Sequence, residues 1–575
     1  MRKNILIFII LLSLGLYSCE KFLEPYGQNY RSEDEIIYNP AYAEGILLRG
    51  YISMPSGYDF ELDVASDDAV TNDRNSTYRR MAVGEWKSTF DPIEQWTNAY
   101  AQIYYLNKFI EISKSVVWAR DSVLPKPNRE LRNILFAKRL KGEAYGLRGW
   151  YKWRLLQYHG GRTADNRLLG FPIIDNTIDI SDNWKLPRDT YGDCVASIFN
   201  DLDTAIKYLP ATWFDRPTGG TNPVVNGDTN IAMGARYENR INSNTARALK
   251  ARVALLAASP SFADGSGVTW EQAAILAGPL LKKLGALYAN GRVFYKEIKN
   301  KEIIWNRAQV SIRSWELNNF PPSLFGNGRT NPSQNLVDAF GMKNGYPINN
   351  TPYDPTKPYL NRDPRLTDYI IYNGATLKSK PIYTYIGAPS DGINVLMTST
   401  RSGYYLKKFM SESVNLDPST TGTNSAHTYT FVRMTELLLN FAEAANEAWG
   451  TTGDPIGYGF TAKSKIQELR ARAGITQPDA YLNSIIDKDG LRELIRNERR
   501  IELCFEGFRF WDIRRWGDVQ AMQQPVKGAN LTEITGGYSF QYPDVEIRAF
   551  SPDMIYGPIP YKEVLKYNID QNNGW

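Results

Sequence analysis

Hydrophobic positions recur every three to four residues along much of the chain, which is the spacing of an amphipathic α-helix. Several of these segments also carry helix signals at their ends. Asp91 followed by Pro92 opens one of them, because aspartate caps a helix and proline is tolerated in its first turn. The pattern predicts helices over residues 42–54, 91–114, 128–158, 191–208, 243–258, 270–284, 431–449, 461–473 and 488–506.

The helical pattern is interrupted at recognisable places. A His-Gly-Gly run at 159–161 ends the long third helix, and Gly278 followed by Pro279 should kink the sixth or force an adjustment in it. Residues of about 300–425 are rich in proline, glycine, asparagine and threonine, so we expect loops with short strands and helices there. The chain is therefore predicted to be mostly α, with tetratricopeptide-like helix pairs, although no 34-residue repeat is evident.

The N-terminus has the pattern of a signal peptide. Arg2 and Lys3 precede an uncharged, mostly apolar stretch over 5–16, which is shorter than the about 20 residues that span a membrane. Leu-Tyr-Ser at 16–18 before Cys19 is similar to a lipobox, with a tyrosine bulkier than the usual middle residue. We expect 1–18 to be removed, Cys19 to be acylated and 19–27 to act as a tether; an ordinary secretory signal with a free Cys19 is the alternative.

Composition indicates a large body outside the membrane. The chain has 575 residues, of which 22% are charged, and its formal net charge is +5. Removing 1–18 takes away Arg2 and Lys3 and no acidic residue, which leaves +3, too little to indicate nucleic-acid binding. Cys194 and Cys504 are then the remaining cysteines and do not make a disulfide framework; whether they pair stays open.

Aromatic residues are abundant and the usual catalytic signatures are missing. The chain contains 14 Trp, 36 Tyr and 23 Phe; many must be core, but Trp and Tyr also stack on sugar rings. The two histidines, His159 and His427, are not at metal-ligand spacing, and neither a GxSxG elbow nor a P-loop occurs. Residues 264–267 lack the alternating oxygen ligands of a calcium loop. We expect neither a cofactor nor a metal.

Residues 496–518, RNERRIELCFEGFRFWDIRRWGD, are the most distinctive segment, and we predict a helix followed by a basic, aromatic turn. Glu498, Glu502 and Glu506 recur every four residues and should share one helical face. Arginines in the same segment can answer them in fork-shaped ion pairs, which favours a structural network over a catalytic carboxylate cluster. These arginines are Arg499, Arg500, Arg509, Arg514 and Arg515.

This segment resembles the ER..EL.FEG.R..DL.RWG signature of the SusD/RagB family, surface lipoproteins that capture nutrients for an outer-membrane importer. Further segments resemble family motifs in the same order and cover nearly the whole mature chain. Thr435 stands where alanine is usual, and Trp575 replaces a final tyrosine. The matching segments are 141–161, 244–260, 363–366, 429–450, 464–475 and 557–575.

The resemblance implies a SusD-like helical fold over 28–575 with the loop-rich region inserted at about 300–425. It also implies a glycan-binding protein, held on the outer membrane by its lipid and facing the cell surface, that serves a SusC-type TonB-dependent transporter. A RagB-type protein that captures oligopeptides is the runner-up. A surface glycosidase is the third alternative; it needs paired carboxylates about 5–10 Å apart, and no catalytic signature supports it, so we expect no enzyme.

Three irregular places are candidate ligand contacts, because loops on a rigid scaffold carry function. One is the loop 63–86, which could equally be an ordinary solvated loop. Another is Trp96, which the resemblance places near ligand-contacting aromatics, although its helical stripe with Tyr100, Ile103 and Asn107 could be core. The third is Trp315 with Arg313 and Asn318, whereas Trp305 should be buried. The residues selected in the loop 63–86 are Asp67, Asp68, Asn72, Asp73, Arg74, Arg79 and Trp86.

Overall fold

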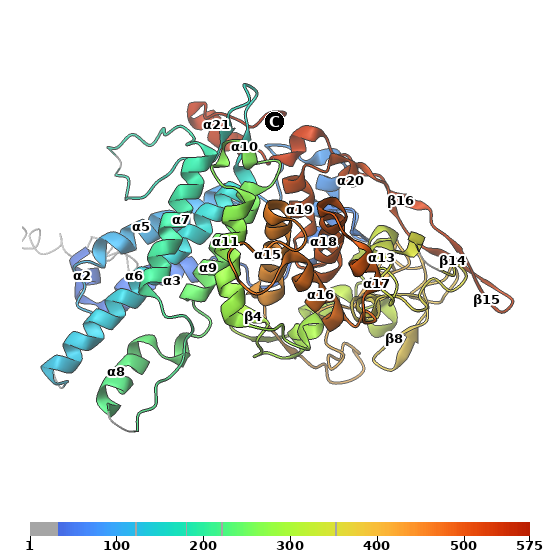
Figure 1. The fold of residues 1–575 in the computed structure, drawn as a ribbon, viewed down its shortest axis with the longest axis horizontal. Coiled ribbons are helices and arrows are strands. Elements are labelled where there is room, and N and C mark those ends of the chain that lie inside the picture. The colour runs from blue at the N-terminus through green and yellow to red at the C-terminus, as the bar shows by residue number, and fades with distance from the viewer. Residues whose placement is uncertain (1–32, 121–123, 180, 220–221, 351–352) are drawn as a thin grey trace, which may run out of the picture.

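The computed structural model describes residues 33–120, 124–179, 181–219, 222–350 and 353–575. The predicted signal peptide 1–18, Cys19 and the tether 19–27 lie outside the described residues. None of the described helices is long and apolar enough to cross a membrane. Figure 1 shows long helices at one end, a middle group of C-terminal helices, and a loop-rich part with short strands at the other end.

Long helices form the scaffold, and every predicted helix is present. Neighbours along the chain pack on one another as pairs, in the order α3, α5, α6, α7, α9, α11, α15 and α16, as in tetratricopeptide arrays. The long helices are α3 (Pro40–Ile52), α5 (Trp96–Ile112), α6 (Lys126–His159), α7 (Tyr191–Tyr208), α9 (Ser243–Ala258), α11 (Trp270–Leu284), α15 (Met434–Trp449), α16 (Ala462–Ala473) and α18 (Lys488–Glu502).

Shorter helices and single turns connect these elements. The shorter α-helices are α2 (Glu33–Tyr38), α4 (Thr77–Arg80), α8 (Pro223–Met233), α10 (Ala263–Ser266), α12 (Ser314–Asn319), α13 (Gln334–Ala339), α14 (Pro364–Tyr369), α17 (Ala480–Ser484), α19 (Arg509–Trp516), α20 (Val519–Gln523) and α21 (Tyr561–Tyr567). The other turns are η1 (Phe60–Ala65), η2 (Met81–Glu85), η3 (Ala235–Tyr237), η4 (Gly291–Lys296), η5 (Pro322–Leu324), η6 (Ile348–Asn350) and η7 (Pro552–Ile555).

The strands are short and pair two by two in antiparallel fashion. Several pairs join distant parts of the chain and tie the loop-rich region to the scaffold. These are β1 (Ala69–Thr71) with β6 (Thr330–Pro332), β4 (Ile303–Asn306) with β12 (Thr430–Arg433), and β5 (Val310–Ile312) with β11 (Ser425–His427). The others are β2 (Gly161–Arg162) with β3 (Leu168–Leu169), β7 (Ile370–Ile371) with β10 (Tyr405–Leu406), β8 (Ala375–Leu377) with β9 (Lys380–Ile382), β13 (Val526–Lys527) with β16 (Asp544–Glu546), and β14 (Asn530–Ile534) with β15 (Gly537–Gln541).

Helix α11 accommodates its proline by an adjustment and continues to Leu284. Pro279 has no N–H for the carbonyl of Ile275, four residues earlier. The hydroxyl of Tyr458 lies 3.5 Å from that carbonyl oxygen and donates to it instead. Gly278 makes room for the tyrosine, because a Cβ at this position would lie 2.4 Å from the Tyr458 ring.

Three predicted boundaries are wrong by three residues or more. Helix α5 begins at Trp96 rather than 91, because the Asp91 carboxylate accepts hydrogen bonds from Trp86 and Ile93 and does not cap the helix. Helix α15 begins at Met434 rather than 431, because Thr430–Arg433 pair as strand β12 with β4. Helix α18 ends at Glu502, since Phe505 and Gly507 adopt positive φ angles of 60° and 77°. The predicted turn after it is helix α19, and helix α8 was not predicted, although Asn222 followed by Pro223 is a usable helix-start signal.

Two large apolar cores hold the two parts together. The first lies among the long helices and includes Trp305, which is buried as predicted and donates from Nε1 to the Asn239 carbonyl at 3.1 Å. The second lies in the loop-rich region and includes Phe340, Tyr369 and Tyr404. The C-terminal helices α18 and α19 stand between these regions in Figure 1, so contacts made by residues 488–516 can join them.

Candidate ligand-binding pocket

The acidic face of α18 is a structural ion-pair network, as predicted, but its partners differ from the prediction. Glu498 lies 2.9 Å from Arg365 and 2.7 Å from Arg470. Glu502 lies 2.6 Å from Arg472 and also contacts Arg365 and Arg433. The partners thus come from α14, α16 and β12, far along the chain, because the arginines beside these glutamates on α18 project in other directions.

The arginines of the segment 496–518 answer other carboxylates. Arg515 makes a two-pronged pair with Glu443 on α15, with both N–O distances 2.6 Å. Arg499 binds Asp512 in the same manner at 3.0 and 3.1 Å. Arg514 donates only to backbone carbonyls among the described residues. This second set joins α15, α18 and α19 into one rigid block.

Much of the segment 63–86 is buried, so the alternative of an ordinary solvated loop does not hold for residues 63–71. Asp67 accepts hydrogen bonds from Arg509 at 2.8 and 3.0 Å, and Arg500 reaches both Asp67 and Asp68. Burial opposes ionisation of Asp67, yet Arg500 and Arg509 hold its pKa below the ordinary value. The two arginines pull this segment inward and occupy its carboxylates.

Other predicted contacts in and near this segment are also engaged by the protein itself. Asn72 donates to the carbonyls of residues 327 and 328 at 2.8 and 2.9 Å, and Arg79 pairs with Glu546 at 2.6 Å. Trp86 is buried and donates to Asp91 at 3.0 Å. Asp73 pairs with Arg329 at 3.2 Å, while Arg74 supplies a carbonyl to Arg79. Trp96 is buried in the first core.

The predicted Trp315 cluster does not meet on one surface. Trp315 is 9% exposed and packs against Phe60 and His427, with ring centroids 5.3 and 4.3 Å away. Arg313 and Asn318 are exposed to solvent. Burial of the indole explains the difference, because the second core surrounds it. The role of these residues as ligand contacts stays a prediction.

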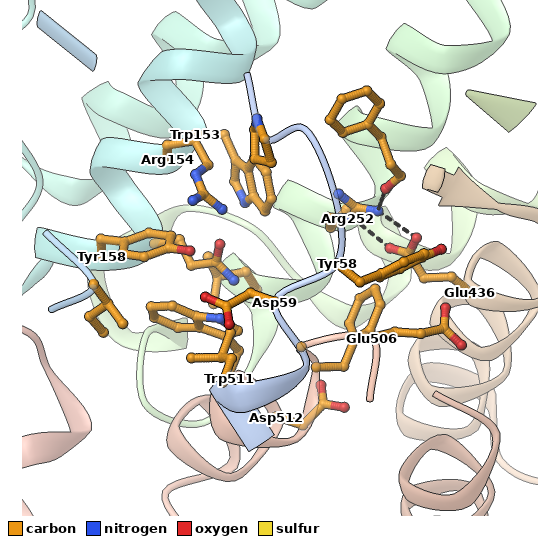
Figure 2. A pocket seen from close by; sticks show the side chains of 18 of the residues that line it. Tyr58, Asp59, Trp153, Arg154, Tyr158, Arg252, Glu436, Glu506, Trp511 and Asp512 are labelled. Atoms are coloured by element: carbon orange, nitrogen blue, oxygen red, sulfur yellow. Dashed lines mark hydrogen bonds and ion pairs between the residues drawn. The ribbon is translucent and has the colours of Figure 1, made fainter. Parts of the chain in front are cut away.

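A pocket of about 260 Å³ opens where α6, α9, α15 and α19 approach one another (Figure 2). Helix α6 supplies one wall, because its pocket residues recur at the spacing of a single helical face. These residues are Trp150, Trp153, Arg154, Gln157 and Tyr158. The facing walls come from Tyr58, Asp59, Arg252, Tyr429, Glu436, Glu506, Trp511 and Asp512, among others.

Aromatic rings line much of this pocket. Tyr158 and Trp511 pack with ring centroids 4.3 Å apart, and Trp150 packs on Trp153 at 4.8 Å. Tyr429 is half-buried and lies 4.7 Å from Tyr58. Rings offer apolar faces with polar edges, so the pocket can hold a ligand that has both apolar and hydroxyl groups. The buried Nε1 of Trp153 has no hydrogen-bond partner within the described part of the chain.

Most charges in the pocket walls are neutralised by neighbours. Arg252 pairs with Glu436 at 2.5 Å, and Arg499 and Arg515 are held as described above. Glu506 lies 2.7 Å from Lys408 and 2.8 Å from Arg433. These pairs fix the walls, because both members of each pair are partly or fully buried.

Two pocket charges, Arg154 and Asp59, have no oppositely charged partner among the described residues. The Arg154 guanidinium lies 4.2 Å from the centroid of the Tyr158 ring. Asp59 accepts a hydrogen bond from the Tyr78 hydroxyl. Desolvation in the pocket raises the pKa of Asp59, and the Tyr78 hydrogen bond opposes that rise. Both side chains remain available to a ligand.

The sequence interpretation missed this pocket because it concentrated on irregular segments. The α6 residues lie within the segment 141–161, which resembles a family motif and contains none of the candidate ligand contacts. Their signal was the helical stripe at 150, 153, 154, 157 and 158, which mixes aromatic residues with arginine and glutamine. A metal centre is not suggested, since no group of three or more His, Cys, Asp or Glu side chains across the described ranges is placed to hold one.

Family models match two regions of the chain. One, described as "SusD family", matches residues 301–575, and another, described as "Starch-binding associating with outer membrane", matches 43–221. Three curated relatives come from Formosa agariphila, and SusD-like proteins P25 and P38 are two of them. SusD-like protein P25 is 26% identical over 48% of this chain and 50% of its own length; SusD-like protein P38 is 34% identical over 21% and 22%. The matched regions thus span half or less of these relatives.

Solved structures share the fold over nearly the whole chain. A SusD-like protein from Bacteroides fragilis superimposes with a TM-score of 0.73 and 22% identity, covering 95% of this chain and 99% of that one. A structure titled laminarin-binding SusD-like protein gives a TM-score of 0.59 and 19% identity over 94% of this chain and 100% of that one. At these identities the likeness establishes the fold.

Proposed function

The chain belongs to the SusD/RagB family, and on that premise we propose that it is a cell-surface binding lipoprotein that captures oligo- or polysaccharide. We further propose that it delivers the glycan to a SusC-type TonB-dependent transporter in the outer membrane. A family match described as starch-binding and associated with the outer membrane supports both the ligand class and the location. The aromatic pocket between α6 and α19 is the observation that carries the proposal.

The pocket suits a carbohydrate in physical terms. A sugar ring can place its C–H face on the ring of Tyr429, which is only half-buried, while Gln157, Arg154 and Asp59 meet its hydroxyl groups. Each neutral hydrogen bond replaces one to water and contributes about 0.5–1.5 kcal/mol. Affinity at one pocket is therefore expected to be modest, and repeated units of a polymer would raise it by multivalency.

The size of the pocket bears on how the ligand binds. A volume of about 260 Å³ is slightly below the ~300–1,000 Å³ of sites that enclose drug-sized ligands. The pocket therefore fits a short stretch or one end of a glycan, and the rest of the chain would extend outward. Arg313 and Asn318, which are exposed, are proposed as outer contacts for such an extended chain.

The lipid anchor and the transporter complete the proposed role. Acyl chains on Cys19 would hold the protein at the membrane, with 19–27 as the tether. In this arrangement ligand would bridge the binder and the transporter and favour their closed state by differential affinity. Co-purification from detergent-solubilised membranes tests the partnership; a protein that repeatedly emerges alone and fully soluble would contradict it. Binding without cleavage is proposed, so no catalytic residue is assigned.

Calorimetry on residues 20–575 is the decisive experiment, with a panel of polysaccharides and mixed oligopeptides and product analysis on the same samples. Heat with a glycan and unchanged chain lengths is the expected result. Tyr429→Ala should weaken that binding, whereas Tyr383→Ala, an exposed tyrosine outside the pocket, should not. Heat with peptides alone would favour the RagB-type alternative, and new chain ends in the glycan samples would mean that the protein is an enzyme.

A further inference from the structure

Among the described residues that line the pocket, one cation has no anionic partner. Four arginines line it, and Arg252, Arg499 and Arg515 are each held by a carboxylate within 3.1 Å. Arg154 makes no ion pair with any described residue and is only partly buried. A cation in a partly enclosed site loses some of its hydration, which an anion can replace, so the missing partner is expected in the ligand.

The setting of Arg154 prepares it for an anion that presents two adjacent oxygens. Its position on the pocket-facing stripe of α6 is rigid, because the neighbouring Trp153 and Leu155 are buried. Tyr158 lies one helical turn later and packs against the guanidinium, whose centre is 4.2 Å from the ring centroid. The Tyr158 hydroxyl also lies within reach of Arg154, and the remaining N–H groups at the edges of the guanidinium can donate to a ligand.

We propose that the captured glycan carries an anionic group, a carboxylate or a sulfate ester, and that Arg154 binds it in the pocket. This inference rests on the proposed glycan-binding function and specifies its ligand class. Both groups present oxygens in a geometry that a guanidinium fork can meet, whereas a neutral sugar would leave Arg154 uncompensated. The charge therefore acts as a selection device within an otherwise aromatic site.

Asp59 lines the same pocket and carries a charge opposite in sign to that of Arg154. Its carboxylate lines the pocket and is fixed by the Tyr78 hydroxyl. A sugar hydroxyl can hydrogen-bond to this group, while an anion is repelled from it. The two residues together would orient an acidic sugar with its anionic group toward α6.

Matched ligand pairs test the proposal directly. Oligogalacturonate is compared with its methyl ester, which has the same backbone without charge, and a sulfated galactan oligosaccharide with its desulfated form. Calorimetry on residues 20–575 should show about a ten- to hundredfold preference for the charged member of one pair, the range expected for hydrogen bonds to charged groups. The pair that shows the preference identifies the anion as carboxylate or sulfate.

Variants connect the preference to Arg154. Arg154→Gln should abolish it, and Arg154→Lys should retain part of it as a single point charge. Arg129→Gln is the matched control, because Arg129 lies on the same helix about 37 Å away and outside the pocket. Asp59→Asn should change affinity in the opposite direction and strengthen binding of the charged ligand. Unfolding temperatures of all four variants establish that each is folded.

Salt dependence supplies an independent readout. Raising the ionic strength should weaken binding of the charged ligand to the wild type and have little effect on its binding to Arg154→Gln, since screening acts on the ion pair. Equal affinity for charged and neutral members, or a preference that survives in Arg154→Gln, would overturn the inference while leaving glycan capture intact. Failure of every glycan in the panel would overturn the proposed function and this inference with it.

Discussion

Replacing Glu502 by glutamine should destabilise the protein strongly, although the two side chains have nearly the same shape. Glu502 is fully buried beside Arg472, Arg365 and Arg433, at 2.6, 3.1 and 3.3 Å. Burial alone would favour its neutral form, but these three guanidinium groups outweigh that effect and lower its pKa from 4.5 to about 2. Glutamine keeps the volume and removes the charge that the arginines require.

The expected loss is about 3 kcal/mol at pH 7. The difference between an ordinary pKa of 4.5 and a folded value of about 2 corresponds to about 3 kcal/mol, because each pKa unit is worth about 1.36 kcal/mol. Breaking a buried pair by removing one partner typically costs about 3–5 kcal/mol, which agrees with this figure. The exposed pair Lys126–Glu130 offers a control, and Glu130→Gln should cost roughly 0.5 kcal/mol or less.

Urea-induced unfolding followed by tryptophan fluorescence measures the difference, because urea leaves the ionic strength unchanged. The folded pKa of Glu502 lies below its unfolded value, so its stabilisation is present above about pH 4.5 and disappears as the pH falls toward about 2. The difference in unfolding free energy between the wild type and Glu502→Gln should decrease over that pH interval. A loss below about 1 kcal/mol at pH 7, or a gap that stays constant from pH 7 to pH 3, would refute the reasoning.

Further changes test other parts of the fold. Burial raises the pKa of Asp91 from 3.8 to about 7, so ionisation of this side chain lowers the stability of the folded state as the pH rises through that interval. Asp91→Asn should therefore raise the unfolding temperature more at pH 8 than at pH 5, and an equal rise at both pH values would contradict this. Cys194 and Cys504 are buried and unpaired, and burial raises the pKa of Cys194 to about 12. A thiol reagent should therefore leave the native protein, residues 20–575, unlabelled and should label both cysteines after unfolding. Rapid labelling of the native protein would count against this prediction. Gly278→Ala should destabilise the folded protein by roughly 1–3 kcal/mol through a clash with Tyr458, whereas Gly45→Ala, with open space around it in α3, should not. Thermal unfolding measures the difference, and a Gly278→Ala variant more stable than the wild type would be evidence against this packing.

The sequence predicts a helix correctly where the residues that determine its limits lie within the helix itself. Residues 191–208, 243–258 and 270–284 were predicted with the observed limits, because capping residues and the apolar period both lie within each segment. The start of α15 was missed because strand β12 pairs with β4, more than a hundred residues earlier. Partners of Glu498 and Glu502 were likewise beyond reach, since they lie on other elements.

The pocket illustrates the same limit at the level of function. Trp153, Arg154 and Tyr158 form a stripe that in sequence could pack against another helix entirely. Only the arrival of Trp511 from α19 and Tyr429 from the segment before β12 turns the stripe into a pocket wall. The segment 63–86 shows the converse: its polar residues resemble a binding loop until Arg500 and Arg509 are placed against them.

The contact of Asp67 and Asp68 with Arg500 and Arg509 has a consequence for biosynthesis. The partners are separated by 432 to 442 residues, so synthesis must have passed Arg509 before the two carboxylates can be neutralised by both arginines. A polypeptide that terminates before Arg500 would leave both carboxylates uncompensated and the interior open to water and proteases. The same contact therefore distinguishes a polypeptide that extends through Arg509 from one that stops before Arg500.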